Sequence, residues 1–389
     1  MTRAQVVAEP GDDEAGALHG RGAAAAVRGP GPPPRTRLVS TPCVFSCLTA
    51  RVCSQEADGG QQVLREGHRA RDEEGQHRQQ VCPEAQRAGS CGRAPGPCAA
   101  DLESGHNVTA TVYAECHSMY RTEGEEQLKS VGESEFVAGV SAMSASGNYG
   151  ETAVCQVMFA HTDMTLGNKV NYVLDAHERA SGGRLRGVRI SCGWDKSPKI
   201  RNVAPGPGML SDGRVVEASR ILERRKLSLD VWLYHPQILE LAGLAAACPE
   251  LTIILNHVGS PILGGPYRNQ SEQVMQEWSE AIKKLAQHEN VFVKLGALPI
   301  RLNKTLKEGY NPEHAPGSAE VAATWRPWIE GCIDAFGPSR CMFESNFPVQ
   351  KNWCSYLVVW NAYKRIAAEF SPDTKAKLFA ETARRAYRM

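Results

Sequence analysis

The chain has 389 residues, with 44 Lys and Arg against 43 Asp and Glu, so its formal net charge is +1. A charge this balanced gives no reason to expect nucleic acid or an anionic membrane as a partner, and no apolar run approaches the roughly 20 residues that span a bilayer. The 13 Cys residues are scattered without a CxxC pair. This pattern predicts reduced thiols in a cytoplasmic protein, with organelle targeting as the open alternative.

Residues 1–100 differ in composition from the rest of the chain. They contain no Lys, Asn, Tyr or Trp, and Phe45 is their one aromatic residue. A segment with so few large apolar side chains cannot offset its conformational entropy by packing, which predicts a disordered, low-complexity segment. A further hypothesis is that this stretch is a mis-predicted exon, because Arg without Lys, with much Ala, Gly and Pro, is what GC-rich DNA encodes.

Residues 101–389 form the predicted folded domain, in which short apolar runs alternate with longer amphipathic stretches. Apolar runs of four to eight residues are typical of strands buried on both faces of a parallel sheet. The predicted strands are Asn107–Cys116, Ala153–Ala160, Leu185–Ser191, Ser228–His235, Leu251–His257, Val291–Leu295 and Arg340–Ser345.

Helical periodicity marks the stretches between several of these strands. Asn168–Ala180, Asp212–Lys226 and Glu272–His288 each place apolar residues along one face. Ser371 followed by Pro372 is typical of a helix start. Strand–helix alternation of this length predicts an α/β fold and, within it, a (β/α)8 TIM-like barrel. A doubly wound open sheet is the alternative, but it favours a glycine-rich phosphate loop that the sequence lacks.

Two predicted strands end in histidine, namely His235 and His257. The carboxyl ends of barrel strands converge on one mouth, so the two imidazoles are candidates for proton transfer or for binding a metal. A lone histidine after an apolar run is more often a buried structural residue. Two histidines at equivalent positions favour a functional role.

The last predicted strand is followed by a carboxylate and an amide. Glu344 is a candidate general base or ligand, and its alternative role is an ion pair with an Arg inside the barrel. Asn346 can orient a substrate but cannot accept a proton in the reaction. We predict that both residues belong to the catalytic site.

Several other polar residues lie at strand ends. Arg189 is a cation on a buried strand, which is costly unless a carboxylate from the substrate or from Glu344 pairs with it. Glu115 and His117 have the spacing of an HxH pair with one His replaced by Glu. We predict substrate-binding roles for Arg189, Glu115 and His161, and a loop-capping role for Asp163.

Six phrases together resemble one family. The phrases SGHNVTATVYAECHSMYR, FAHTDMTLG, GVRISCGWD, LYHP, LNHVGSP and CMFESNFPV occur in an order and spacing similar to those of the amidohydrolase-related ("amidohydrolase 2") family, over roughly Asp101 to Met389. The resemblance implies a distorted (β/α)8 barrel. Members resemble lactonases acting on sugar or dicarboxylate lactones, and decarboxylases of aromatic acids. Within GVRISCGWD, Trp194 is a further candidate for substrate binding.

The family pattern places an HxH pair after strand one, a His after strands five and six, and an Asp after strand eight. His235 and His257 match the two single histidines, whereas Asn346 stands where the Asp is expected and Glu344 is its partial substitute. No HxH occurs before Asn107, so the first strand is expected to be missing, leaving two unpaired sheet edges. The resemblance implies one divalent metal, Zn²⁺, on His235 and His257, but two ligands are fewer than the usual three.

These observations favour a hydrolase that acts on a small carboxylated substrate, a lactone or a compound with a similar C–O or C–N bond. A decarboxylase of the same superfamily is one alternative, and it would need a metal. The other alternative is a truncated, catalytically inactive member. The expected partner is a small molecule, and the sequence does not indicate an oligomeric state.

Overall fold

The computed structural model of the chain describes residues 47–49, 101–102, 104–298 and 315–389. The predicted disorder of residues 1–100 therefore concerns a segment that lies, apart from residues 47–49, outside the described residues. The domain boundary at residue 101 stays a prediction.

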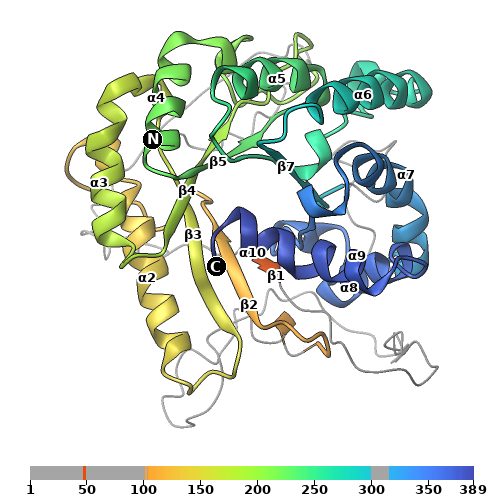
Figure 1. Cartoon of the computed structure of the whole chain (residues 1–389), viewed down its shortest axis with the longest axis horizontal. Coiled ribbons are helices and arrows are strands. Elements are labelled where there is room, and N and C mark those ends of the chain that lie inside the picture. The colour runs from red at the N-terminus through yellow and green to blue at the C-terminus, as the bar shows by residue number, and fades with distance from the viewer. Residues whose placement is uncertain (1–46, 50–100, 103, 299–314) are drawn as a thin grey trace, which may run out of the picture. The chain divides into compact units, whose positions relative to one another are not determined.

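Seven strands lie in chain order in one sheet, and each runs parallel to the next. The register places Arg189 beside Asp230 on neighbouring strands. The sheet curls as part of a (β/α)8 barrel (Figure 1), which confirms the predicted fold class and all seven predicted strands. The strands are β2 (Ala110–Ala114), β3 (Ala153–His161), β4 (Leu185–Ser191), β5 (Ser228–Trp232), β6 (Ile253–Leu255), β7 (Val291–Leu295) and β8 (Cys341–Phe343).

The edge of the sheet at β2 is not bare. A short strand, β1 (Cys47–Thr49), pairs with β2 in antiparallel orientation, with Leu48 opposite Val112. The expectation of two unpaired edges was therefore wrong at this edge. Within the described ranges β8 ends the sheet on the other side, and no parallel strand precedes β2.

The helices surround the outer face of the curled sheet (Figure 1). Predicted starts are confirmed at Asp212 and Ser371, whose side chains accept hydrogen bonds from the backbone N–H groups of Arg214 and Thr374. None of the described helices is long and apolar enough to cross a membrane. The helices are α2 (Val131–Ala145), α3 (Val170–Ala180), α4 (Gly213–Arg224), α5 (Ile238–Ala247), α6 (Ser271–Leu285), α7 (Ser318–Phe336), α8 (Tyr356–Ile366), α9 (Pro372–Ala376) and α10 (Thr382–Ala386).

The buried faces of the helices follow their apolar periodicity. In α3 and α6 apolar residues at helical spacing are buried along one face, including Leu174 and Trp278. In α4 Val215 is buried, whereas Val216 is half-buried. These faces pack on the outer side of the sheet and form the main hydrophobic core.

A second, smaller core lies on the opposite face of the sheet. It joins alternate strand residues, including Phe159 and Met342, to Ala383, Ala386 and Tyr387 from the C-terminal end of the chain. The rings of Tyr387 and Phe159 are stacked with centroids 5.7 Å apart. The C-terminal segment with α10 therefore covers the inner face of the sheet and leaves the carboxyl ends of the strands for the site.

Candidate functional site

Most of the predicted site residues lie at the carboxyl ends of the strands. Glu115 follows β2, His161 is the last residue of β3, and Arg189 lies within β4. His257 lies two residues beyond β6, and Glu344 directly follows β8. Because these strands are parallel, their carboxyl ends meet at one mouth, where barrel enzymes carry their active sites.

His257 and Glu344 form a hydrogen-bonded pair at this mouth. Nδ1 of His257 lies 2.5 Å from Oε1 of Glu344, and the Glu344 side chain is only 2% exposed. Burial alone would raise the pKa of Glu344, but the nearby positive charges of His257, Lys294 and Arg189 lower it overall. When His257 is neutral with its proton on Nδ1, the ionised carboxylate accepts that hydrogen bond, and the Nε2 lone pair is available for proton transfer.

Arg189 and Glu115 form a second ion pair. Nε of Arg189 donates to Oε1 of Glu115 at 2.7 Å, and Nη2 donates to the backbone carbonyl of the same residue. The sequence favoured a substrate carboxylate or Glu344 as the partner of this buried cation, and the structure provides Glu115 instead. Burial opposes ionisation of Glu115, but Arg189 and the neighbouring histidines hold its pKa below the usual value.

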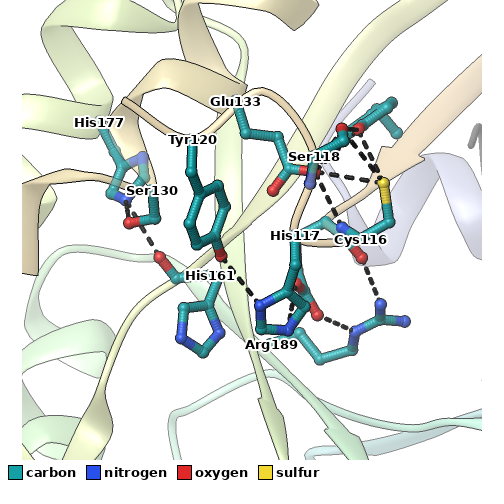
Figure 2. A network of polar contacts seen from close by, with 11 residues as sticks. Cys116, His117, Ser118, Tyr120, Ser130, Glu133, His161, His177 and Arg189 are labelled. Carbon is teal, nitrogen blue, oxygen red and sulfur yellow. Dashed lines mark hydrogen bonds and ion pairs between the residues drawn. The ribbon is translucent and has the colours of Figure 1, made fainter. Parts of the chain in front are cut away.

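Glu115, His117 and His161 bring their polar atoms together beside this ion pair. Figure 2 shows the rings of His117 and His161 near Arg189. Oε2 of Glu115 lies 3.4 Å from Nε2 of His117, and the rings of His117 and His161 have centroids 4.8 Å apart. Ligand-type atoms of all three residues lie within 4.8 Å of one another. Across the described ranges, no other set of three or more His, Cys, Asp or Glu residues meets this criterion.

The backbone at His161 is held by a buried polar network. Nε2 of His177, in α3, lies 3.1 Å from the carbonyl oxygen of His161 and 3.2 Å from the hydroxyl of Ser130. The hydroxyl of Ser134 lies 2.8 Å from the other ring nitrogen of His177. Two residues after His161, Asp163 caps the following turn by accepting from the N–H of Thr165, as predicted.

His235 is placed differently from His257. It is buried, and its Nδ1 accepts a hydrogen bond from the backbone N–H of Ile262 at 3.2 Å. Burial lowers the pKa of His235 to about 4, so the ring is neutral at pH 7 with its proton on Nε2. Neither ring nitrogen then presents a free lone pair to a metal. The metal-binding role of His235 stays a prediction that this hydrogen bond disfavours.

Asn346 and Trp194 lie in loops that follow β8 and β4. Asn346 adopts a left-handed backbone conformation with φ 50°, which Asn tolerates better than most residues, and its carbonyl accepts from the N–H of Gln350. The backbone N–H of Trp194 donates to the side chain of Gln237 at 2.9 Å, and its ring is half-buried. Substrate contacts by either residue stay predictions.

A buried charge pair beneath the mouth was not predicted from the sequence. Nζ of Lys294 lies 2.6 Å from Oδ1 of Asp230 and 4.4 Å from the centroid of the Phe159 ring. The carboxylate of Asp230 also accepts hydrogen bonds from Tyr387 and Asn256. The signal was present in the sequence, because Lys294 and Asp230 are single charges within apolar strands, as Arg189 is.

Comparisons with known proteins identify the family of the chain. A family profile described as Amidohydrolase matches residues 109–389. The chain belongs to the amidohydrolase family. It is 36% identical over 168 residues to an uncharacterized protein, y4mH, of Sinorhizobium fredii, covering 43% of this chain and 49% of the relative. It is 25% identical over 211 residues to an L-fucono-1,5-lactonase of Burkholderia multivorans, covering 53% and 64%. The chain therefore spans only part of the length of these relatives, 49% of the first and 64% of the second.

Solved structures of an amidohydrolase from Burkholderia multivorans share the fold. Two crystal forms, one with bound HEPES and one with bound zinc, each superpose with a TM-score of 0.52. The sequence identities between these two structures and the present chain are 19% and 20%. Each superposition covers 66% of the present chain and 79% of the Burkholderia chain. At this level of identity the similarity supports the barrel fold and assigns no role to individual residues.

Proposed function

We propose that this amidohydrolase hydrolyses a lactone, or a similar C–O or C–N bond, in a small carboxylated substrate. The observation that carries the proposal is the His257–Glu344 pair, in which a buried carboxylate lies 2.5 Å from Nδ1 of a histidine at the barrel mouth. The similarity to an L-fucono-1,5-lactonase, although distant, favours a lactone over other substrates.

The chemistry follows from the orientation of His257. With Nδ1 held by Glu344, Nε2 accepts a proton from water as the water oxygen attacks the substrate carbonyl carbon. The ring C–O bond then breaks, and the proton on Nε2 passes to the departing alkoxide, which yields the hydroxy acid. Glu344 stays ionised throughout and stabilises the imidazolium that forms between the two steps, so its role is to position His257 and not to act as the base.

Arg189 is our candidate for holding the substrate carboxylate. Its Nε and Nη2 groups are engaged by Glu115, while Nη1 donates to no acceptor among the described residues. The Arg189 side chain is 15% exposed, so it is not completely enclosed by the described residues. An Arg with one edge fixed and another edge free can bind a carboxylate with little loss of side-chain entropy.

The proposal is tested by turnover on a panel of sugar 1,5-lactones and carboxylated lactones, L-fucono-1,5-lactone included. We expect hydrolysis above the spontaneous rate, and a loss of roughly 10²- to 10⁴-fold in kcat for His257→Ala. His288→Gln is the matched control, because His288 precedes β7 and lies at the opposite end of the strands from the mouth.

Two other outcomes separate the alternatives. Release of CO2 from an aromatic acid, without lactone hydrolysis, would identify a decarboxylase. No turnover of any lactone, from a chain that remains folded by circular dichroism, would favour the inactive member and contradict the proposal.

A further inference from the structure

We propose that Glu115, His117 and His161 bind one divalent metal ion, Zn²⁺, at the mouth between β2 and β3. The site differs from a pair formed by His235 and His257. It requires no known substrate, so its test is independent of the proposed hydrolysis.

The ligand chemistry suits zinc. Two imidazoles and one carboxylate form the ligand set of several catalytic zinc sites, which keep a further position open for water. Magnesium and calcium favour sites built from oxygen ligands, whereas imidazole favours zinc and other transition metals.

The geometry is close to what a tetrahedral site needs. Ligand atoms at about 2.0–2.1 Å from a tetrahedral zinc ion lie roughly 3.3–3.4 Å from one another. Oε2 of Glu115 and Nε2 of His117 are already 3.4 Å apart. The most distant ligand atoms are within 4.8 Å of one another, so closing the site needs a side-chain movement of roughly 1.5 Å.

His117 is the residue that can make this movement. Its side chain is 59% exposed and lies in the loop after β2, whereas the carboxylate of Glu115 is buried. Nδ1 of His117 lies 3.3 Å from the hydroxyl of Tyr120. When Nδ1–H of His117 donates to this hydroxyl oxygen, Nε2 presents its lone pair to a metal, as outer partners arrange in known zinc sites.

The buried carboxylate of Glu115 is a second, independent observation that indicates a cation. Glu115 is 1% exposed, and its Oε2 accepts no hydrogen bond from the described residues. Arg189 holds Oε1, and this contact directs Oε2 toward the two imidazoles. Leaving one oxygen of a buried carboxylate without a hydrogen bond is unfavourable, and a bound metal ion would remove that penalty.

His161 completes the set from a fixed position. Its backbone carbonyl is held by His177, while its ring faces that of His117 (Figure 2). No described group donates to or accepts from its ring nitrogens. A ring that is anchored through its backbone and free at both nitrogens can bind a metal without breaking a hydrogen bond.

The test uses the full chain, stripped of metal with a chelator and then dialysed against Zn²⁺ or Co²⁺. We expect close to one zinc per chain by mass spectrometry, and visible absorption typical of four- or five-coordinate Co²⁺. His117→Ala and His161→Ala should each weaken zinc binding at least tenfold by calorimetry. His235→Ala and His257→Ala are the matched controls and should keep the metal.

Three outcomes would overturn the site. The wild-type chain could bind no zinc, in which case Glu115 and His117 form an ordinary ion pair. Zinc could be lost in His235→Ala or His257→Ala but kept in His117→Ala, which would place the metal on the other pair. It could also persist in both His117→Ala and Glu115→Gln. Because His117 is exposed, its substitution should not unfold the chain, so the test remains decisive if His161→Ala does.

Discussion

His257 and Glu344 are 87 positions apart in the sequence, yet Nδ1 of one lies 2.5 Å from Oε1 of the other. They follow β6 and β8, which are separated in the sheet by β7. The residue after β7 is Gly296, and a Cβ built there would lie 2.7 Å from the carbonyl oxygen of Glu344 and 2.8 Å from its Cγ. Glycine at position 296 therefore leaves the space that the Glu344 side chain occupies while it contacts His257.

Replacing Glu344 by Gln should separate the effect of the carboxylate charge on His257 from the effect of the size of the side chain. The amide side chain is nearly the same size but neutral, so it neither stabilises an imidazolium on His257 nor selects the tautomer with the proton on Nδ1. We expect kcat for lactone hydrolysis to fall by about 10²-fold or more with KM changed much less. Steady-state kinetics on the best lactone of the panel measures this. An unchanged kcat would contradict the positioning role of Glu344.

A methyl group at Gly296 should disturb the same pair. Gly296→Ala forces Glu344 or Tyr363 to shift, because both lie within contact distance of the new Cβ. Overpacking of this kind typically destabilises by about 1–3 kcal/mol, and we expect a matching loss of hydrolysis. Urea unfolding and steady-state kinetics measure the two effects.

The control for Gly296 is Gly243→Ala. Gly243 is exposed in α5, and nothing lies within 4 Å of a Cβ there. An alanine in the interior of a helix is favoured over glycine by roughly 0.5–1 kcal/mol, so Gly243→Ala should stabilise the chain slightly and leave kcat unchanged. Equal effects of both substitutions would show that the close contacts at Gly296 are unimportant.

The sequence could predict the strands because each is an apolar run bounded by polar residues, and a parallel sheet buries both faces of its strands. It could also predict the side of the barrel on which His257 and Glu344 lie, since both follow strands. It could not predict that Arg189 pairs with Glu115, 74 positions away, because Glu344 is an equally good chemical partner. Choosing between Glu115 and Glu344 requires the position of β4, which carries Arg189, relative to the loop after β2, which carries Glu115.

The residues beneath the mouth were missed for a related reason. Lys294 and Asp230 interrupt apolar runs that are otherwise typical of strands, and a single charge does not change such a prediction. Their pairing depends on the curl of the sheet and on Tyr387, which comes from the C-terminal end of the chain. The pairing of Lys294 with Asp230 requires the relative positions of β5, β7 and the C-terminal segment, which the sequence alone does not provide.

Breaking the buried pair of Lys294 and Asp230 should destabilise the fold. Lys294→Met leaves Asp230 buried without its cation, and removing one partner of a buried ion pair typically costs about 3–5 kcal/mol. The double variant Lys294→Met with Asp230→Leu removes both charges and should recover part of that loss. Urea unfolding at constant pH measures both variants. If the single variant were as stable as the wild type, the pair would contribute nothing to the fold.

The stability of the chain should fall in mild acid through His106. Nδ1 of His106 lies 3.1 Å from Nζ of Lys364 in α8. Burial and then this nearby positive charge lower the pKa of His106 from 6.5 to about 4. Between pH 6.5 and about 4, His106 binds a proton in the unfolded chain but not in the folded chain. The contribution of neutral His106 to stability is therefore complete above pH 6.5 and declines as the pH falls toward 4.

The free energy of unfolding, measured in urea at pH 7.5 and 5.0, tests this relationship. The wild type should lose stability between the two values, and His106→Gln should lose less because it has no proton to gain. Lys364→Met should also lessen the decline, since the folded chain then accepts the proton on His106 more readily. Were both variants to decline as steeply as the wild type, the acid sensitivity would belong to other groups, because both substitutions remove the repulsion between His106 and Lys364.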